Sequence, residues 1–253
     1  MECLQRKKEP VLGFEVDLFS MEEALQFTNQ CLQENNGLHI VTINPEMIAM
    51  GNNDSEFGRV LNEADLTIPD GVGVKLALKI KGVNQEAVPG IEFSKKLIGL
   101  CSLEGYTIGL LGAKEEIVQK ASMNLRKEFP GLNITYIRNG YFSFEEENII
   151  KEEIKAVGPR VLFVALGAPK QEMFISELKK QMPESIFIGV GGSFDVWSGV
   201  TKRAPQIWQK LGLEWLYRTL KEPARFRRIF PALPLFLIQV IMETIHEKIG
   251  AIR

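Results

Sequence analysis

The sequence predicts an α/β fold, a Rossmann-like parallel sheet flanked by helices, followed by a helical C-terminal part. Short runs that are apolar throughout recur along the chain, and a helical pattern follows most of them. Such runs are typical of strands covered on both faces, and intervening helices are typical of right-handed parallel crossovers. With 253 residues, 45% of them apolar, the chain can bury a substantial core.

The first elements are a predicted β-pair over 11–18 and a helix from about Ser20. Ser20 is the expected N-cap, and Glu23 has the spacing of a capping box. Six apolar runs then predict the strands of the sheet: 38–43, 65–69, 106–112, 132–137, 160–167 and 186–192. From about Ala204 the pattern is helical only, so we expect a Rossmann-like domain over 1–203 and a helical appendage over 204–253.

The last helical segment predicts one apolar face at three- and four-residue spacing. The residues of this face are Leu233, Phe236, Leu237, Val240, Ile241, Ile245 and Ile249, and Leu235 and Ile238 widen it. The apolar run 229–242 contains two prolines and is shorter than the roughly 20 residues that cross a bilayer. We therefore expect a chain that does not span a membrane but can lie on one. Packing on the core or on a second subunit is the alternative.

Charge is segregated along the chain. Residues 201–253 carry a net charge of +6, from ten Lys and Arg against four Glu, which leaves −8 on residues 1–200. A basic end indicates an anionic partner. Nucleic acid is disfavoured as that partner, because the region is interleaved with aliphatic residues and lacks an aromatic stacking platform. Three widely spaced cysteines fit a reducing cytosol, and the charged N-terminus argues against a signal peptide.

Polar residues and glycines follow the predicted strands, where ligands bind in open parallel sheets. The positions singled out as binding candidates from this pattern are Asn44, Asp70, Gly112, Tyr141, Gln171, Gly191, Gly192 and Asp195. Glycine allows backbone N–H groups to approach a phosphate, so we expect a phosphorylated ligand. Each position also has a simpler interpretation. Pro-Asp-Gly at 69–71 is a turn with a capping aspartate, and Gly189–Gly192 lacks the dinucleotide fingerprint.

Several stretches together resemble one family. TINPEM, ADLTIPDGVGV, FVALGAPKQE, GVGGSFDVWSG and KRAPQIWQKLGLEWLYRTLKEPARFRR are similar to the WecG/TagA/CpsF family of bacterial glycosyltransferases over roughly residues 11–230. Within the family the chain is most similar to the TagA-like N-acetylmannosaminyltransferases. The resemblance implies a GT-E-like glycosyltransferase fold with a C-terminal appendage that closes the active site and associates with the membrane.

The resemblance also implies an activity. Family members transfer a sugar, typically N-acetyl-D-mannosamine from its UDP form, to the C4 hydroxyl of N-acetylglucosamine on undecaprenyl diphosphate. The β-linked product is an early intermediate of wall teichoic acid or a related surface polymer. The expected protein is peripheral on the cytoplasmic, inner face of the cell membrane and needs no metal cofactor. A homodimer or higher oligomer in solution is left open.

Functional residues follow from the same resemblance. Asp70 matches the proposed general base, Thr42 and Asn44 a polar pair lining the pocket, and Gln171 a glutamine near the donor sugar. Tyr141 and Asp195 are the candidates for holding the uridine. The appendage arginines that would face the diphosphate are Arg218, Arg225 and Arg228. Arginine can neutralise the charge of leaving UDP without a metal. Their simpler interpretation is as surface cations.

One position departs from the family pattern. Ala87, before Val88-Pro89-Gly90, stands where many relatives have an arginine implicated in activity. This leaves open transfer of another UDP-sugar such as glucose, or a non-catalytic protein that binds nucleotide sugars. A dinucleotide oxidoreductase is disfavoured by the missing fingerprint.

Overall fold

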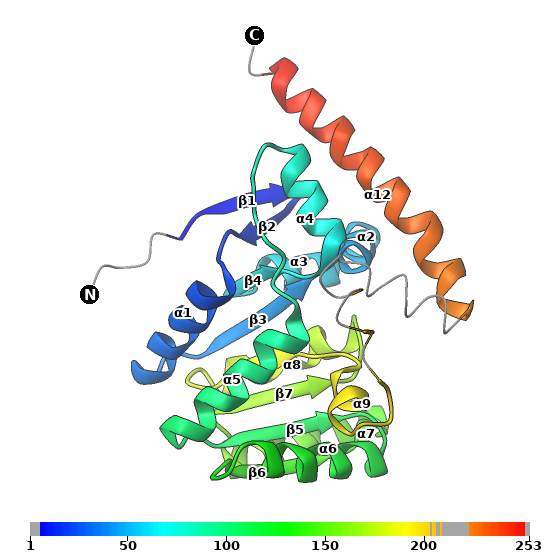
Figure 1. Cartoon of the computed structure of the whole chain (residues 1–253). Helices are drawn as coiled ribbons and strands as arrows, with labels where there is room; N and C mark the ends of the chain where they lie inside the picture. The colour runs from blue at the N-terminus through cyan, green and yellow to red at the C-terminus, as the bar shows by residue number, and fades with distance from the viewer. Residues whose placement is uncertain (1–5, 203, 206–207, 209–222, 251–253) are drawn as a thin grey trace.

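The computed structural model contains a six-stranded, all-parallel sheet with the order β4-β3-β8-β7-β5-β6 (Figure 1). The structure describes residues 6–202, 204–205, 208 and 223–250, with side chains of the last segment from Leu233 onward. The strands are β3 (Leu38–Ile43), β4 (Leu66–Pro69), β5 (Ile108–Gly112), β6 (Ile134–Arg138), β7 (Val161–Ala165) and β8 (Ile186–Gly189). The predicted Rossmann-like α/β fold is confirmed.

Helices cover both faces of the sheet. One face is covered by α1 (Met21–Gln33), α5 (Gly90–Glu104), α6 (Glu115–Glu128) and α9 (Ser193–Trp197). The other is covered by α2 (Pro45–Asn53), α3 (Ser55–Asn62), α4 (Gly71–Ile80), α7 (Phe144–Val157), α8 (Lys170–Gln181) and α12 (Pro223–Gly250). This double covering explains why the strands are apolar on both sides.

The N-terminal β-pair is an antiparallel hairpin, β1 (Lys8–Val11) and β2 (Phe14–Asp17), beside the edge strand β4. Asp17, fully buried, accepts a hydrogen bond from the N–H of Thr67 at 2.8 Å and pairs with the guanidinium of Arg6. The pair stabilises the buried charge and ties the hairpin to the sheet. The predicted capping box of Ser20 and Glu23 is present at the start of α1.

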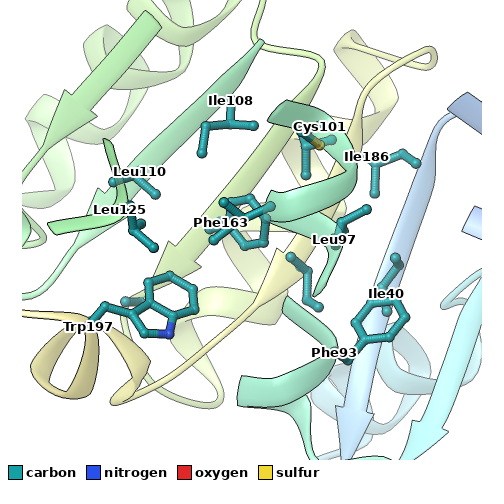
Figure 2. Close-up of a cluster of buried hydrophobic side chains, with 14 of the residues drawn as sticks. Ile40, Phe93, Leu97, Cys101, Ile108, Leu110, Leu125, Phe163, Ile186 and Trp197 are labelled. Atoms are coloured by element: carbon teal, nitrogen blue, oxygen red, sulfur yellow. The ribbon is translucent and has the colours of Figure 1, made fainter. Parts of the chain in front are cut away.

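The larger core lies between the sheet and α5 (Figure 2). Phe163 of β7 is fully buried there, and its ring centroid lies 6.0 Å from that of Trp197 in an edge-to-face arrangement. Phe93 and Leu97 of α5 lie against Ile40 of β3 in the same cluster. Burial of such side chains contributes about 1.5–3 kcal/mol each. α5 therefore holds the two halves of the sheet under one apolar layer.

Two elements differ from the sequence prediction. α5 was not predicted, although its buried residues recur at helical spacing. The helical pattern after β3 is broken into α2 and α3 at Asp54, whose carboxylate accepts from the N–H groups of Glu56 and Phe57. An N-cap that satisfies two amides at once favours a new helix over continuation of the first.

The apolar residues of α12 form two faces, so the single predicted face is wrong. Leu233, Phe236, Leu237 and Val240 pack on the core beside α2 and α4, and Phe236 and Val240 are buried. A second set is 43–59% exposed: Leu235, Ile238, Ile241, Met242, Ile245 and Ile249. At about 100° per residue, this exposed stripe spans an arc of roughly 120° on the side opposite the core. The division into a domain over 1–203 and an appendage over 204–253 stays a prediction.

Lys81, at the end of α4, anchors the distal half of α12. Its side chain is 2% exposed, and Nζ lies 2.8 Å from Glu247, 3.3 Å from Glu243 and 3.9 Å from Glu9. Burial alone would lower the pKa of Lys81, but hydrogen bonds and charge from Glu247 and Glu243 outweigh burial and raise it. Glu243 also accepts from the N–H of Leu12 at 3.1 Å. The ammonium group thus joins α12, α4 and the hairpin.

Lys81→Met should loosen α12, because Glu243 and Glu247 would lose their shared cation. We expect a loss of roughly 1–3 kcal/mol in unfolding free energy and faster amide exchange over residues 233–250. Urea denaturation and hydrogen exchange measure both. Lys75→Met is the matched control, because Lys75 also lies on α4 but pairs with an exposed residue outside the helix, Glu86. Unchanged exchange in α12 of the Lys81 variant would contradict the anchoring role.

His39 is buried in β3, near the amino end of the strand. Burial lowers the pKa of its imidazole to about 4, partly opposed by Asp65. Its Nε2 has no hydrogen-bond partner among the described residues. The backbone N–H of His39 donates to Asp65 at 2.6 Å, and Lys179 pairs with the same carboxylate. The ring is therefore a neutral core group.

Acidification should destabilise the protein through His39. The unfolded imidazole, with a pKa near 6.5, binds a proton before the folded one does, so stability is present above that value and is lost as pH falls toward 4. Between pH 7 and pH 5 the wild type should lose about 2 kcal/mol relative to His39→Phe. Urea denaturation of both proteins at the two pH values measures this. Equal pH dependence would show that His39 is not responsible.

Candidate active site

The loops after the six parallel strands meet at one edge of the sheet. In Figure 1 the arrowheads of β3, β5 and β7 point to the same side, where α9 lies. Backbone hydrogen bonds join these loops: Asp70 N–H donates to Ile43 O at 2.9 Å, and Gly140 N–H donates to Ala113 O at 2.9 Å. This is the edge at which parallel sheets bind ligands.

Asp70 follows β4 and precedes α4. It occupies the N-cap position of α4, but its carboxylate makes no capping hydrogen bond to that helix. The Oδ1 atom accepts instead from the N–H of Gly90, at 3.3 Å, at the start of α5. Val88 N–H donates to Pro69 O at 2.8 Å, so the segment before α5 runs alongside the end of β4. The carboxylate is thus aimed across the edge rather than back at its own helix.

Thr42 and Asn44 lie at the end of β3, next to β4. A methyl group on Gly90 would lie 2.8 Å from Cγ2 of Thr42, so only glycine permits this approach of α5. Thr42, Gly90 and Asp70 are therefore brought together. Asn44 caps α2, because its Oδ1 accepts from the N–H groups of Glu46 and Met47 at 3.0 and 3.1 Å. The side-chain oxygen of Asn44 is therefore occupied by the helix cap, and the role of Asn44 in lining the pocket stays a prediction.

Gln171 is 5% exposed and joins two loops. Its Oε1 accepts from the N–H of Gly167 at 3.1 Å and from the N–H of Gly191 at 3.2 Å. Its Nε2 donates to Oε1 of Glu172 at 2.7 Å. The side chain lies under the loops after β7 and β8, and its role near the donor sugar stays a prediction.

Glu172 was not singled out from the sequence. It is 2% exposed, and desolvation raises the pKa of its carboxyl to about 7, partly opposed by the hydrogen bond from Gln171. Helical spacing could have indicated burial of this pair, because Ile175 and Leu178 follow on the same face of α8. A buried carboxyl with a raised pKa at a ligand-binding edge is a mark of functional sites.

Gly112 and Tyr141 lie at the β5–β6 end of this edge, away from Asp70, which follows β4. Gly112 has φ 133°, and a methyl group there would lie 2.3 Å from the carbonyl oxygen of Ala165, so only glycine fits. Tyr141 is 73% exposed, and its N–H donates to Oδ1 of Asn139 at 3.0 Å. The ring is accessible for stacking on a base, but it belongs to the loop after the edge strand β6.

Gly191, Gly192 and Asp195 follow β8. Gly191 has φ 47° and Gly192 is the N-cap of α9, so two adjacent glycines form the turn. Asp195 lies in α9, and its carbonyl oxygen accepts from Thr201 N–H and from the Ser198 hydroxyl, both at 2.9 Å. Gly191 of this turn donates to Gln171, and the contact of these three residues with uridine stays a prediction.

The three appendage arginines precede α12 or lie in its first turns. Arg218 lies outside the described residues, and Arg225 and Arg228 lie in α12, where their side chains are not described. Leu233 of the same helix lies close to Gly73, at 3.0 Å from a methyl placed there, three residues after Asp70. Leu233 comes ten residues after α12 begins at Pro223, so it is the third turn of the helix that lies beside the start of α4. Convergence of the arginines on the site stays a prediction.

No three His, Cys, Asp or Glu side chains come together as a metal site would need, within the part of the chain that the structure describes. In that part there is also no helix with the length and hydropathy to cross a bilayer.

Comparisons with known proteins agree over nearly the whole chain. Residues 9–249 match the model of the glycosyl transferase WecG/TagA/CpsF family. The chain belongs to this family. Two relatives are N-acetylglucosaminyldiphosphoundecaprenol N-acetyl-beta-D-mannosaminyltransferases. The Bacillus spizizenii protein is 34% identical over 221 residues, 87% of this chain and 84% of the relative. The Staphylococcus aureus protein is 32% identical over 239 residues, 92% of each chain.

Membership of the WecG/TagA/CpsF family confirms the expected resemblance and makes the chain a glycosyltransferase. Ala87, where many members of the family have an arginine, lies beside residues that contact the candidate site. That residue precedes the segment which approaches Asp70 through Val88 and Gly90. The adjacent Glu86 pairs with Lys75 of α4 at 2.5 Å, so an ion pair joins this segment to α4.

Proposed function

We propose that the protein transfers N-acetyl-D-mannosamine from UDP-ManNAc to the C4 hydroxyl of GlcNAc-diphosphate-undecaprenol, with inversion, giving a β-1,4 disaccharide lipid. The observation that carries this proposal is the similarity, over about nine-tenths of the chain, to relatives whose names state the transferred sugar, N-acetyl-beta-D-mannosamine, and the acceptor, N-acetylglucosaminyldiphosphoundecaprenol. A product of this kind would serve wall teichoic acid or a related surface polysaccharide.

In the proposed mechanism Asp70 is the general base. A sugar hydroxyl is a poor nucleophile, and a carboxylate within reach can accept its proton as the oxygen attacks C1 of the donor. The bond from C1 to the β-phosphate oxygen breaks on the opposite face, and its electron pair leaves with UDP. The Gly90 N–H and the backbone bond from Asp70 to Ile43 support the proposal, because they hold the carboxylate at the edge.

The charge on leaving UDP needs a positive partner. We assign this role to Arg218, Arg225 and Arg228, since guanidinium groups bind diphosphate oxygens in a bidentate manner. Transfer then requires no metal ion. The contact of Leu233 with Gly73 supports this assignment, because Arg225 and Arg228 precede Leu233 in α12 by eight and five residues.

Asp70→Asn should lower kcat by roughly 10²–10⁴-fold while UDP binding stays near the wild-type value, since shape is kept and basicity is lost. The assay combines purified protein, UDP-ManNAc and a short-chain GlcNAc-diphosphate lipid, with product mass and linkage determined. UDP-glucose in parallel tests the alternative donor. Asp54→Asn is the matched control, because asparagine also caps a helix. Near-normal transfer by Asp70→Asn would remove the residue from this role.

The acceptor is a membrane lipid, and α12 offers a surface for reaching it. We propose that the exposed stripe defined above rests on the inner face of the cell membrane. Its large apolar side chains would each gain up to about 1.5–3 kcal/mol if fully buried, and cations in the basic C-terminal region would add about 1 kcal/mol each near anionic lipid. The chain thus would act as a peripheral membrane protein.

The triple variant Ile241→Ser, Ile245→Ser and Ile249→Ser should bind anionic liposomes at least about tenfold more weakly, because apolar area is removed without touching Phe236 or Val240. Cosedimentation measures this. The matched control is Leu103→Ser with Phe144→Ser, which removes exposed apolar groups elsewhere, 86% and 84% exposed. Binding equal to that of the wild type, or an equal loss in the control, would contradict the membrane role.

A further inference from the structure

The Gln171–Glu172 pair is a linked set of hydrogen bonds beneath two loops. Each polar atom of the Gln171 amide has a partner: Oε1 accepts from Gly167 and Gly191, and Nε2 donates to Glu172. Gly167 follows β7 and Gly191 follows β8. One side chain therefore sets the distance between the loops after two neighbouring strands.

Glu172 fixes which way this amide points. If the amide were reversed, its NH₂ group would face two N–H donors and its oxygen would face a carboxyl oxygen. Only the observed orientation satisfies all three contacts. The pair is buried, and a buried polar group left without its partner costs about 1–3 kcal/mol. Loss of the Glu172 acceptor would therefore release the amide and, with it, the two loops.

Gly189 leaves the space that the pair needs. It is the last residue of β8, and a methyl group there would lie 2.4 Å from Nε2 of Gln171 and 2.7 Å from Oε1 of Glu172. Those distances are too short for any side chain, so the strand backbone and the pair are in direct contact. This is a steric requirement that is independent of the hydrogen bonds.

We propose that Glu172 is a positioning residue for the donor nucleotide: through Gln171 it holds the loops after β7 and β8 at the spacing that UDP requires. The inference rests on the proposed function and deepens it. The turn of Gly191 and Gly192 is the candidate donor site, whereas Asp70 follows β4, separated from β8 by β3. Disturbing the pair should therefore affect the donor and spare the acceptor.

The protonation state of the Glu172 carboxyl makes Glu172→Gln an informative variant. Burial raises the pKa of Glu172 to about 7, so the group is partly uncharged near neutrality. Its Oε2 has no hydrogen-bond partner among the described residues. The required feature is thus an acceptor oxygen of the right size rather than a negative charge. Glutamine supplies that oxygen, and leucine does not.

The experiment compares four variants of the full chain: Glu172→Leu, Glu172→Gln, Gly189→Ala and, as control, Glu177→Gln. Glu177 lies on the same helix with a side chain that is 59% exposed. UDP Kd is measured by calorimetry, and kcat and KM are measured for donor and acceptor. Glu172→Leu and Gly189→Ala should raise UDP Kd and donor KM about tenfold, with acceptor KM unchanged. Glu172→Gln and Glu177→Gln should match the wild type.

The inference is overturned if Glu172→Leu or Gly189→Ala binds UDP like the wild type, or if Glu172→Gln is as impaired as Glu172→Leu. A loss of kcat at unchanged donor KM would also overturn it, because positioning acts through binding. Should Glu172→Leu fail to fold by circular dichroism, Gly189→Ala and Glu172→Gln decide. Failure of the wild type to bind UDP or transfer sugar would instead refute the proposed function.

Discussion

All six strands of the main sheet run parallel, and this constraint governs the rest of the molecule. Parallel strands can be joined only by crossovers, so every strand delivers its carboxyl end to the same edge. The loops there come from segments as distant as residues 44 and 195, yet backbone hydrogen bonds join several of them directly. The site is therefore a product of topology before it is a product of any one side chain.

Close approach of backbone segments determines how the loops are arranged at this edge. Gly90 allows α5 to reach Thr42 and present an amide to Asp70, while Gly112 lies against the β7 backbone. At each of these positions a single methyl group would collide with a neighbour. Burial of Gln171 and Glu172 adds polar bonds to this packing, and such bonds are directional where apolar contacts are not. Small residues thus bring the loops together, and the buried polar pair fixes how they meet.

The sequence alone predicted most of the sheet, because strands depend on local patterns, and the site residues that it singled out stay a prediction. Apolar runs locate the strands, and Ser20 with Glu23 locates the start of α1. It could not predict which partner each polar group takes. Asn44 and Asp70 both sit at helix starts, yet only Asn44 caps its helix. That difference depends on the approach of α5 from 20 residues further along the chain, which no local pattern records.

Periodicity was also insufficient for α12, where both faces of one helix are apolar. Phe236 and Val240 belong to the same core as residues of β3, and Lys81 pairs with Glu247 in the distal half of the helix. These contacts hold α12 in a fixed position relative to the sheet. A surface that receives the outer stripe would therefore set the tilt of the entire catalytic body. The Rossmann-like part would then keep one fixed orientation to that surface, whereas a flexible linker would let it rotate freely.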